Sequence, residues 1–426
     1  MNQTETFIRL LYIDLFCGAG GTTTGVEAAR VNGEKCAKVI ACVNHDAHAI
    51  ASHAANHPDA LHFTEDIRTL DIAPLAAHLA MAKAQWPNAK VVLWASLECT
   101  NFSNAKGGLP RDADSRTLAE HLFRYIDALN PDYIQIENVE EFMSWGDLDS
   151  KGHPISRDRG RCFISWINSV EKYGYYFDYK ILNAADFGAY TSRKRFFGLF
   201  SRKWLPSAFP HATHRKSGNE GYEIFGEEMF KKWNPVKEVL DLDDEGTSIF
   251  TRKRPLCEKT LERIYAGLIK FVAGGAAQNP LELAKVQFIS KHFSGQPGSK
   301  NTSIDKPTGT LTCKCNQSFV TVFYGNGFNR SIEEPAPTQT AKDSVDIAIF
   351  EDDSPMTVKI KEFMALYNIT DIRMRMLKVI ELKRIMGFPS DYVLIGTQSE
   401  QKKFIGNAVE VNMAKTLAET LAKCIV

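Results

Sequence analysis

The stretch LWASLECTNFS, residues 93–103, joins a core strand to a reactive side chain. Val91 to Ala95 form a short apolar run that is typical of a buried strand. Residues 104–110 contain glycines and a proline, which favour a loop. Cys99 is therefore expected to follow the carboxyl end of a core strand, where ligands bind in open parallel sheets.

This stretch alone leaves two interpretations of Cys99 open. A cysteine in such a place can attack an electron-poor carbon if its pKa is lowered or a partner activates the substrate. A small thiol packed in the core is the commoner arrangement for a single cysteine. Partner residues elsewhere in the chain must decide between the two.

Strand and helix patterns alternate on both sides of this stretch. Strand patterns lie at residues 10–16, 37–43, 63–67, 91–95 and 132–139. Helix patterns lie at residues 22–29, from 47 through 55, at 75–86 and at about 115–129. Residues 175–182 and 196–200 are expected to complete the sheet as a hairpin. This alternation predicts an α/β protein with an open, doubly wound, mostly parallel sheet.

Polar residues and glycines follow several of these strands. Gly18 to Gly21 come directly after the first strand, and glycine lets the backbone approach a ligand closely. Asn44 ends the second strand, where a polar residue commonly meets a ribose. Asp66 and Glu137 end two others. Each alone is readily explained as structural, but their joint placement along one edge of the sheet indicates a ligand site.

Arg193 and Arg195 alternate, which would place both side chains on one face of a strand that begins there. A solvated basic edge is the plainer explanation of an isolated Arg-Lys-Arg.

From residue 201 to residue 368 the regular alternation ends. Short β-like runs, aromatic and basic clusters, glycines and prolines replace it, and KPTGTLT (306–312) is related to EPAPTQT (334–340). We predict a main domain in residues 1–200, a smaller irregular domain in 201–368, and a return to the main domain in 369–426. The basic stretch 252–300 could follow a phosphate backbone or form a solvated surface.

Composition sets the remaining limits. The 426 residues are 44% hydrophobic and 24% charged, values that are ordinary for a globular protein, and the formal net charge of zero neither favours nor excludes nucleic acid. No apolar run is long enough to cross a membrane, and we expect a cytoplasmic protein. The nine cysteines are scattered, and since Cys313 and Cys315 have no partners at zinc-finger spacing, we expect no metal site.

Six motifs in this order resemble those of DNA (cytosine-5) methyltransferases. DLFCGAGG (14–21) resembles the family's S-adenosylmethionine loop, and the Cys99 stretch its nucleophile loop. Glu137-Asn138-Val139 and Arg193-Lys194-Arg195 resemble its catalytic-acid and paired-arginine motifs. Residues 375–389 and GNAV (406–409) resemble its two carboxyl-terminal blocks. The resemblance implies the Rossmann-like fold of class I methyltransferases, with residues 201–368 as the target-recognition domain.

The resemblance also implies a mechanism and a set of site residues. Cys99 would add to C6 of a cytosine flipped out of duplex DNA, and Glu137 would donate to ring N3. Asn138 would position the loop of Glu137, while Arg195, with Arg193, would hold the base oxygen and the adjoining phosphate. The residues implied in binding S-adenosylmethionine are Phe16, Cys17, Gly18, Ala19, Gly20, Gly21, Asn44, His45, Asp66, Ile67, Leu97, Asn407 and Val409.

Four residues depart from the family's usual pattern. Glu98 and Thr100 flank Cys99 where proline and glutamine are usual, Asn44 replaces an acidic ribose ligand, and Thr191 replaces a glutamine. A carboxylate beside a thiol raises its pKa unless it is turned away, and a neutral amide binds a ribose less strongly than a carboxylate does. No departure removes a catalytic group, so we expect activity.

The expected partner is double-stranded DNA, with a cognate restriction endonuclease if the enzyme belongs to a restriction system rather than acting alone. We expect a monomer that does not bind membranes and that is associated with the nucleoid in a bacterial cell. Two alternatives stay open: cytosine-5 methylation of structured RNA such as tRNA, and a non-catalytic DNA-binding relative. The sequence offers no positive evidence for a variant alkyl donor.

Overall fold

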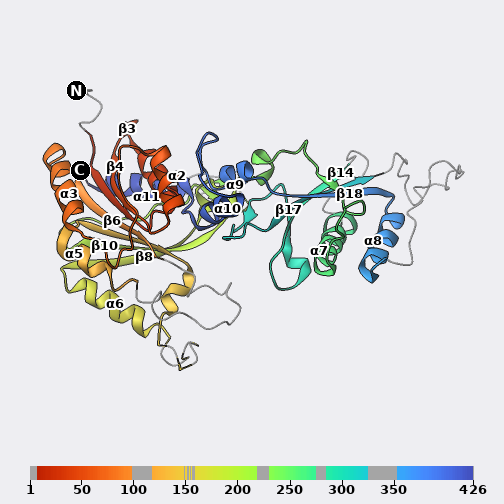
Figure 1. Cartoon of the computed structure of the whole chain (residues 1–426), viewed down its shortest axis with the longest axis horizontal. Coiled ribbons are helices and arrows are strands. Elements are labelled where there is room, and N and C mark those ends of the chain that lie inside the picture. The colour runs from red at the N-terminus through yellow and green to blue at the C-terminus, as the bar shows by residue number, and fades with distance from the viewer. Residues whose placement is uncertain are drawn as a thin grey trace, which may run out of the picture. The chain divides into compact units, whose positions relative to one another are not determined.

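The computed structural model describes residues 7–97, 118–147, 149–150, 153, 155, 159–217, 230–274, 285–324 and 353–425. The chain divides into two compact units (Figure 1). Unit 1 comprises Met1–Trp233, Thr310–Lys314 and Lys383–Val426. Unit 2 comprises Asn234–Gly309 and Cys315–Leu382. These divisions do not coincide with the domain boundaries expected at 200/201 and 368/369, and the role of each segment stays a prediction.

Unit 1 is built on a seven-stranded sheet. Its strand order is β5 (Leu61–Phe63), β4 (Ala37–Val43), β1 (Leu10–Leu15), β6 (Lys90–Ser96), β7 (Tyr133–Asn138), β10 (Lys194–Arg202) and β8 (Tyr175–Asn183). The first five strands are parallel, whereas β10 runs antiparallel to both of its neighbours. This mixed, mostly parallel sheet confirms the predicted α/β architecture and the closing hairpin.

Helices cover both faces of the sheet, and the sequence of β1 shows why. Leu11, Ile13 and Leu15 point into one core, whereas Leu10 and Tyr12 point into the other, because side chains alternate along a strand. The first core is closed by α3 (Ala73–Gln85), α5 (Leu122–Leu129) and α6 (Arg161–Glu171). The second is closed by α1 (Gly21–Glu27) and α11 (Val411–Cys424) (Figure 1).

The strand order reverses at β1, which fixes where a ligand can bind. After β1 the chain moves outward to β4 and β5, then returns to the other side of β1 as β6. In doubly wound sheets the loops diverge at such a point and leave a crevice outside the carboxyl ends of the strands. The glycine turn after β1 and the Cys99 segment after β6 both start there.

Three predicted elements differ from the observed ones. The strand expected at 63–67 is β5, which ends at Phe63, because the chain then turns with the Leu70 amide donating to the Asp66 carbonyl. The helix expected from about 115 is α5, which begins at Leu122; residues up to 117 lie outside the described ranges. Asn407, expected before a helix, instead ends α10 (Gln398–Asn407).

The other elements of unit 1 are short, apart from α2 (Ala47–Asn56), which is capped by the Asp46 side chain. They are β2 (Arg30–Val31), β3 (Glu34–Lys35), η3 (Glu140–Ser144), η5 (Ala184–Phe187), β9 (Thr191–Ser192), β11 (His214–Arg215) and β12 (Lys231–Lys232). Helix α9 (Val379–Ile385) runs across the boundary between the two units. None of the helices in the described ranges has the length and apolar character needed to span a membrane.

Unit 2 is more regular than its sequence suggests. It holds a five-stranded antiparallel sheet in the order β13 (Thr247–Ser248), β18 (Ile369–Met376), β17 (Gln317–Tyr324), β14 (Lys285–Lys291) and β15 (Asn301–Ser303). Helices α7 (Glu258–Leu268) and α8 (Pro355–Leu366) share one apolar core with this sheet. Its shorter elements are η6 (Val236–Val239), η7 (Ile269–Ala273), η8 (Pro297–Lys300) and β16 (Thr308–Gly309). The expectation of an irregular domain is thus corrected.

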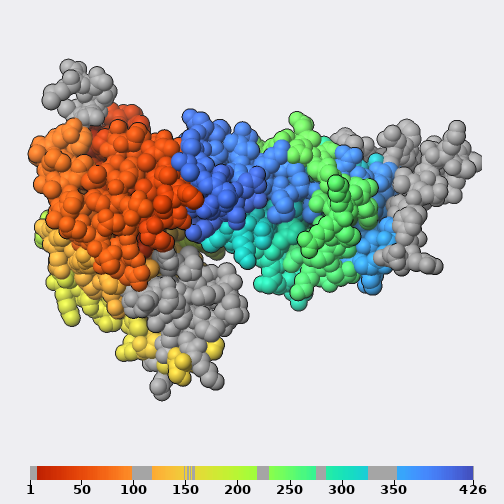
Figure 2. Space-filling view, in the orientation of Figure 1, coloured from red at the N-terminus to blue at the C-terminus, as the bar shows by residue number. Residues whose placement is uncertain are grey.

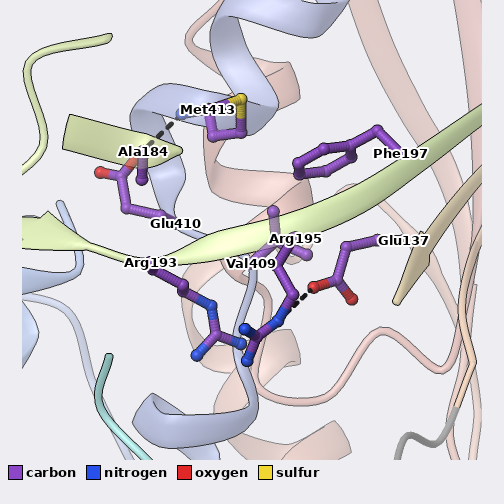
Figure 3. Close-up of a pocket in the computed structure, with 8 residues that line it drawn as sticks. All are labelled: Glu137, Ala184, Arg193, Arg195, Phe197, Val409, Glu410 and Met413. Carbon is purple, nitrogen blue, oxygen red and sulfur yellow. Dashed lines mark hydrogen bonds and ion pairs between the residues drawn. The ribbon is translucent and has the colours of Figure 1, made fainter. Parts of the chain in front are cut away.

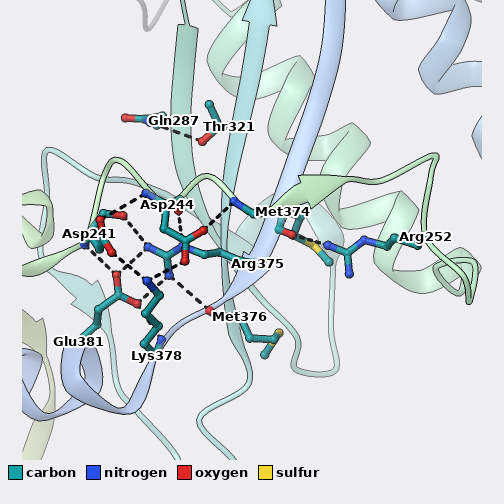
Figure 4. Close-up of polar contacts among 11 residues, drawn as sticks. Asp241, Asp244, Arg252, Gln287, Thr321, Met374, Arg375, Met376, Lys378 and Glu381 are labelled. Atoms are coloured by element: carbon teal, nitrogen blue, oxygen red, sulfur yellow. Dashed lines mark hydrogen bonds and ion pairs between the residues drawn. The ribbon is translucent and has the colours of Figure 1, made fainter.

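A polar cluster ties β18 to the segment before β13 (Figure 4). The guanidinium of Arg375 donates to both carboxylate oxygens of Glu381, each at 2.7 Å, and to backbone carbonyls of Asp241 and Asp244. Glu381 is fully buried and also accepts from the amides of Asp241 and Lys378. Because the Arg375 guanidinium and the Glu381 carboxylate each have several hydrogen-bond partners, their buried charges are compensated.

Replacing Glu381 with glutamine should lower the free energy of unfolding by about 3 kcal/mol, because the buried Arg375 charge loses its counterion. Urea denaturation followed by circular dichroism measures this. Lys378→Gln is the matched control: its ammonium pairs with Asp241 and Asp244 at the surface, where water and salt screen the pairs, so its loss should destabilise the protein far less. Equal effects of the two changes would contradict the structural role given to Arg375 and Glu381.

Candidate active site

The turn after β1 has an unusual backbone. Phe16 has φ 60°, Gly18 φ 53° and Gly20 φ 99°. A left-handed conformation is uncommon for a residue that carries a side chain, and at Phe16 it re-aims the chain as it leaves the sheet. A Cβ added to Gly18 would meet no atom within 4 Å, so this turn borders open space.

The carboxyl-terminal segment packs against the same turn. A Cβ on Gly20 would lie 2.4 Å from Tyr392 Oη, and one on Gly21 would lie 2.6 Å from the Val409 carbonyl oxygen. The Tyr392 hydroxyl donates to the Ala19 carbonyl at 2.5 Å. Figure 2 shows the blue carboxyl-terminal part of unit 1 lying against its red and orange amino-terminal part. Glycine is required at both positions because backbone and side chain come so close.

Asp14 lies beneath this turn and is fully buried. One of its oxygens accepts a hydrogen bond of 2.9 Å from the Thr23 hydroxyl. Burial raises the pKa of the Asp14 carboxyl well above its usual range, and the Cys42 thiol adds to the effect. Asp14 is therefore inside the fold, under the turn rather than on its open side.

The ends of β4 and β5 place the next predicted residues. Asn44 is half-buried, and its side-chain oxygen accepts from the Asp46 amide at 2.9 Å, while His45 is exposed. Asp66 is held by the Arg68 guanidinium at 2.6 Å, and this contact lowers the pKa of its carboxyl. Ile67 is 3% exposed and packs in the core with α3 and α5. The Ile67 side chain is therefore committed to packing, whereas Asn44 and Asp66 remain at the sheet edge.

The tips of β6 and β7 lie side by side. Ser96 is aligned with Glu137 across the parallel pair. Asn138 is buried, and its side-chain amide donates to the Leu97 carbonyl at 3.5 Å while its oxygen accepts from the Val139 amide at 2.8 Å. The segment that leads to Cys99 therefore leaves the sheet beside Glu137. Cys99 itself, with Glu98 and Thr100, lies outside the described residues.

Glu137 and the paired arginines meet in one hollow (Figure 3). Arg195 Nε lies 3.2 Å from Glu137 Oε1, and both side chains are largely buried. Arg193 lies next to Arg195 and donates to the carbonyls of Leu311 and Gly406 at 3.1 and 3.0 Å. Arg195 is thus paired with the carboxylate, whereas these bonds of Arg193 hold two distant backbone segments of unit 1 together.

Of the predicted site residues, Glu137, Arg193, Arg195 and Val409 line this hollow. Its other lining residues are Ala184, Phe197, Glu410 and Met413. Leu97 is buried in the adjacent core, and Asn407 is exposed and accepts from the Cys313 thiol at 2.8 Å. Cys17 and Ala19 are buried within the turn after β1.

Glu410 is a member of the hollow that the sequence did not single out. Its carboxylate caps α11 by accepting from the Met413 amide at 2.8 Å. Burial raises the pKa of Glu410 to about 7, although hydrogen bonds from the Met413 and Asn412 amides and the nearby Arg193 charge act against the shift. An acidic residue three positions before Met413, at the start of an apolar helix pattern, was the available signal.

An open α/β sheet with a glycine turn and a buried acid–arginine pair at its strand tips is typical of proteins that bind a ligand outside the carboxyl ends of the strands. A family model described as C-5 cytosine-specific DNA methylase matches residues 10–423. The chain belongs to this family and is therefore a DNA cytosine-5 methyltransferase by membership.

Curated relatives align along nearly the whole chain. It is 23% identical over 457 residues to the type II methyltransferase M.AgeI of Thalassovita gelatinovora, covering 97% of this chain and 99% of the relative. It is 24% identical over 423 residues to M1.HphI of Haemophilus parahaemolyticus, covering 97% and 87%.

Solved structures share the fold at low sequence identity. A triple mutant of DNMT2 from Spodoptera frugiperda superposes with a TM-score of 0.56 at 15% identity, covering 96% of this chain and 99% of the other. A putative DNA modification methyltransferase from an Escherichia coli prophage gives a TM-score of 0.50 at 17% identity, covering 97% and 99%.

The raised pKa of Glu410 predicts a pH-dependent stability. Between the ordinary pKa of 4.5 and the folded value of about 7, the folded state holds a proton that the unfolded state has lost. The free energy of unfolding should therefore fall by about 3 kcal/mol as pH rises through this window. In Glu410→Gln this component of the fall should be absent, as measured by urea denaturation at a series of pH values.

The exposed Glu120 supplies the control, and Glu120→Gln should keep the pH dependence of the wild type. The same slope in Glu410→Gln and wild type would show that Glu410 titrates normally.

Proposed function

We propose that the chain methylates C5 of a cytosine flipped out of duplex DNA, with S-adenosylmethionine as donor and a transient bond between Cys99 and C6. The observation that carries this proposal is the arrangement at the tips of β6 and β7. Ser96 is aligned with Glu137, and Asn138 holds the Leu97 backbone. Because Cys99 follows Ser96 by three residues, or at most about 10 Å of extended chain, its sulfur is within reach of the Glu137 hollow.

Cys99 and two residues of the hollow have different roles in the proposed reaction. Addition of the Cys99 thiolate to C6 places negative charge on the ring and makes C5 nucleophilic. Glu137 donates a proton to N3 and so neutralises that charge, and Arg195, 3.2 Å away, keeps the carboxyl in place and binds the base oxygen. Once C5 carries the methyl group, its proton passes to a water molecule, Cys99 leaves C6 as a thiolate, and N3 returns its proton to Glu137, which restores the aromatic ring.

The donor site fits the turn after β1 and the tip of β4. The open side of Gly18 leaves room for a ligand beside the backbone, Phe16 is partly exposed next to it, and Asn44 offers a polar group at the adjacent strand tip. S-adenosylmethionine, when bound, supplies the electrophilic methyl group. Phe16 would stack on its adenine, and Val409, which abuts Gly21, would close the site.

Unit 2 supplies a candidate contact with the phosphate backbone. Lys291 is partly buried, and burial together with the nearby charges of Lys300 and Lys270 lowers the pKa of its ammonium. Within the described part of unit 2, neither Lys291 nor Lys300 forms an ion pair. Like charges held close together are stabilised when they meet phosphates. We assign the reading of the target sequence to the segment 201–368, which includes most of unit 2.

The relatives are named type II methyltransferases, which supports a role in DNA modification, either within a restriction system or as a solitary enzyme. Bisulfite sequencing of DNA from cells that express the protein would reveal the strand and the sequence context of the methylated cytosines.

The covalent step can be trapped. In the presence of S-adenosylmethionine, duplexes of randomised sequence that carry 5-fluorocytosine should form a complex that survives denaturing electrophoresis, because after methyl transfer the fluorine at C5 blocks the final elimination. Cys99→Ala should abolish this complex, and Glu137→Gln should lower turnover by about 10²–10⁴-fold, the usual contribution of an acid–base group.

The exposed Cys257 in unit 2 provides the control, since Cys257→Ala should trap DNA as well as the wild type does. A complex that persists in Cys99→Ala would refute the nucleophile assignment. Wild type that binds duplexes but never traps them would favour a non-catalytic relative, and transfer of labelled methyl groups to tRNA alone would overturn DNA as the substrate.

Lys291 and Lys300, which we call the lysine cluster, should make the affinity for DNA depend on salt concentration. The double variant Lys291→Gln, Lys300→Gln should bind duplex DNA more weakly and reduce the slope of log affinity against log salt by about 2, since each phosphate contact contributes about 0.9. Fluorescence anisotropy at several salt concentrations measures this slope. Lys285→Gln should leave it unchanged because Lys285 already pairs with Glu245 at 2.8 Å. A slope unaffected by the double change would remove the cluster from the DNA interface.

A further inference from the structure

A group of sulfur and nitrogen ligands lies beside the turn after β1. The thiols of Cys17 and Cys42 and a ring nitrogen of His53 lie within 4.8 Å of one another, and all three residues are buried. His62 joins them from β5, with its Nε2 2.9 Å from His53 Nδ1 and with a contact to the Cys42 thiol. The four side chains come from separate places in the sequence: the turn after β1, β4, α2 and β5. We infer that this group binds a zinc ion.

The distances suit a tetrahedral ion. Bonds of about 2.3 Å to sulfur and 2.0–2.1 Å to nitrogen place a sulfur and a nitrogen ligand about 3.6 Å apart at the tetrahedral angle. Cys42 Sγ lies 3.6 Å from His53 Nδ1. Two nitrogen ligands would be about 3.4 Å apart, so His62 must move from His53 by about half an ångström to become the fourth ligand.

The hydrogen bonds around His53 orient its ring so that Nδ1 can coordinate the ion. The Thr23 hydroxyl donates to Asp14 at 2.9 Å, so its oxygen is an acceptor toward His53 Nε2, also 2.9 Å away. His53 therefore carries its proton on Nε2 and directs the lone pair of Nδ1 toward Cys42. Metal-binding histidines usually donate their other ring N–H to an oxygen acceptor such as a carboxylate. Here the acceptor is the Thr23 hydroxyl, which in turn donates to Asp14.

The chemistry of the ligands selects the ion. Thiolate sulfur with imidazole nitrogen favours zinc over magnesium or calcium, which prefer oxygen ligands. In the bound state both sulfurs are thiolates and each imidazole coordinates through an unprotonated nitrogen, so any protons held by these atoms pass to solvent. Because Cys17 directly precedes Gly18, the ion would join the glycine turn to β4 and α2. Of the residues implied in methyl transfer, the group contains Cys17, and it contains none of Cys99, Glu137 and Arg195.

The test uses the full chain with reduced thiols. Protein freed of metal by a chelator is titrated with cobalt(II), a spectroscopic substitute for zinc. We expect about one cobalt per chain, a thiolate-to-metal charge-transfer band, release of protons on binding and displacement of cobalt by zinc but not by magnesium. Purified protein should contain zinc by elemental analysis and should melt at a higher temperature with zinc than without it.

Variants locate the ion. Cys42→Ser should lose the charge-transfer band or weaken cobalt binding at least tenfold, whereas Cys36→Ser, the matched control for a buried thiol outside the group, should behave as wild type. His62→Gln should retain the band with weaker binding. Absence of a charge-transfer band in wild type would overturn the inference. A band that survives in Cys42→Ser would do so as well, because it would arise from other thiols such as Cys313 and Cys315.

Discussion

The close contact between Gly21 and the Val409 carbonyl is the constraint on which the rest of unit 1 depends. A Cβ added to Gly21 would lie 2.6 Å from the Val409 carbonyl oxygen, so only glycine, which has no Cβ, fits at this position. This contact joins the turn that follows the first strand to a segment almost 400 residues later, and α11 then covers the sheet face that presents Leu10 and Tyr12. The turn after β1, the hollow around Glu137 and the cap of α11 at Glu410 all share this junction.

Each unit contains an arginine–glutamate pair whose charges are largely buried. In unit 2, Arg375 and Glu381 neutralise each other and fix β18 to the segment that precedes β13. This ion pair has a purely architectural role. In unit 1, Arg195 and Glu137 form a looser pair at 3.2 Å in a hollow, where a substrate could compete for either partner. This contrast supports an architectural role for Arg375 and the catalytic-site role that we propose for Arg195.

Local patterns in the sequence predicted most of the sheet. The strand from Ala37 to Val43 was predicted with its observed bounds because it is β-branched, apolar and ends at a polar turn. The five-stranded sheet of unit 2 was missed, since its central strand β17 pairs with β14 and β18, which both lie far from it in the sequence.

Within the site, Glu137 and Arg195 could be named from motifs. The sequence could indicate Glu410 only as a helix cap, because its raised pKa arises from burial by distant elements. The group of possible zinc ligands could not be named from the sequence either. The spacing of the cysteines predicts no metal site, yet Cys17, Cys42 and His53 converge through the fold.

The position of α11 in the chain has a consequence for biosynthesis. The ribosome completes β1, β4, β6 and the whole of unit 2 before it makes the helix that shields Tyr12, Val39 and Val92 on one face of the first sheet. Until then that face is an apolar surface open to chaperones or to self-association. Premature termination before Val411 would make that exposure permanent, so even a short carboxyl-terminal truncation should direct the nascent protein toward degradation.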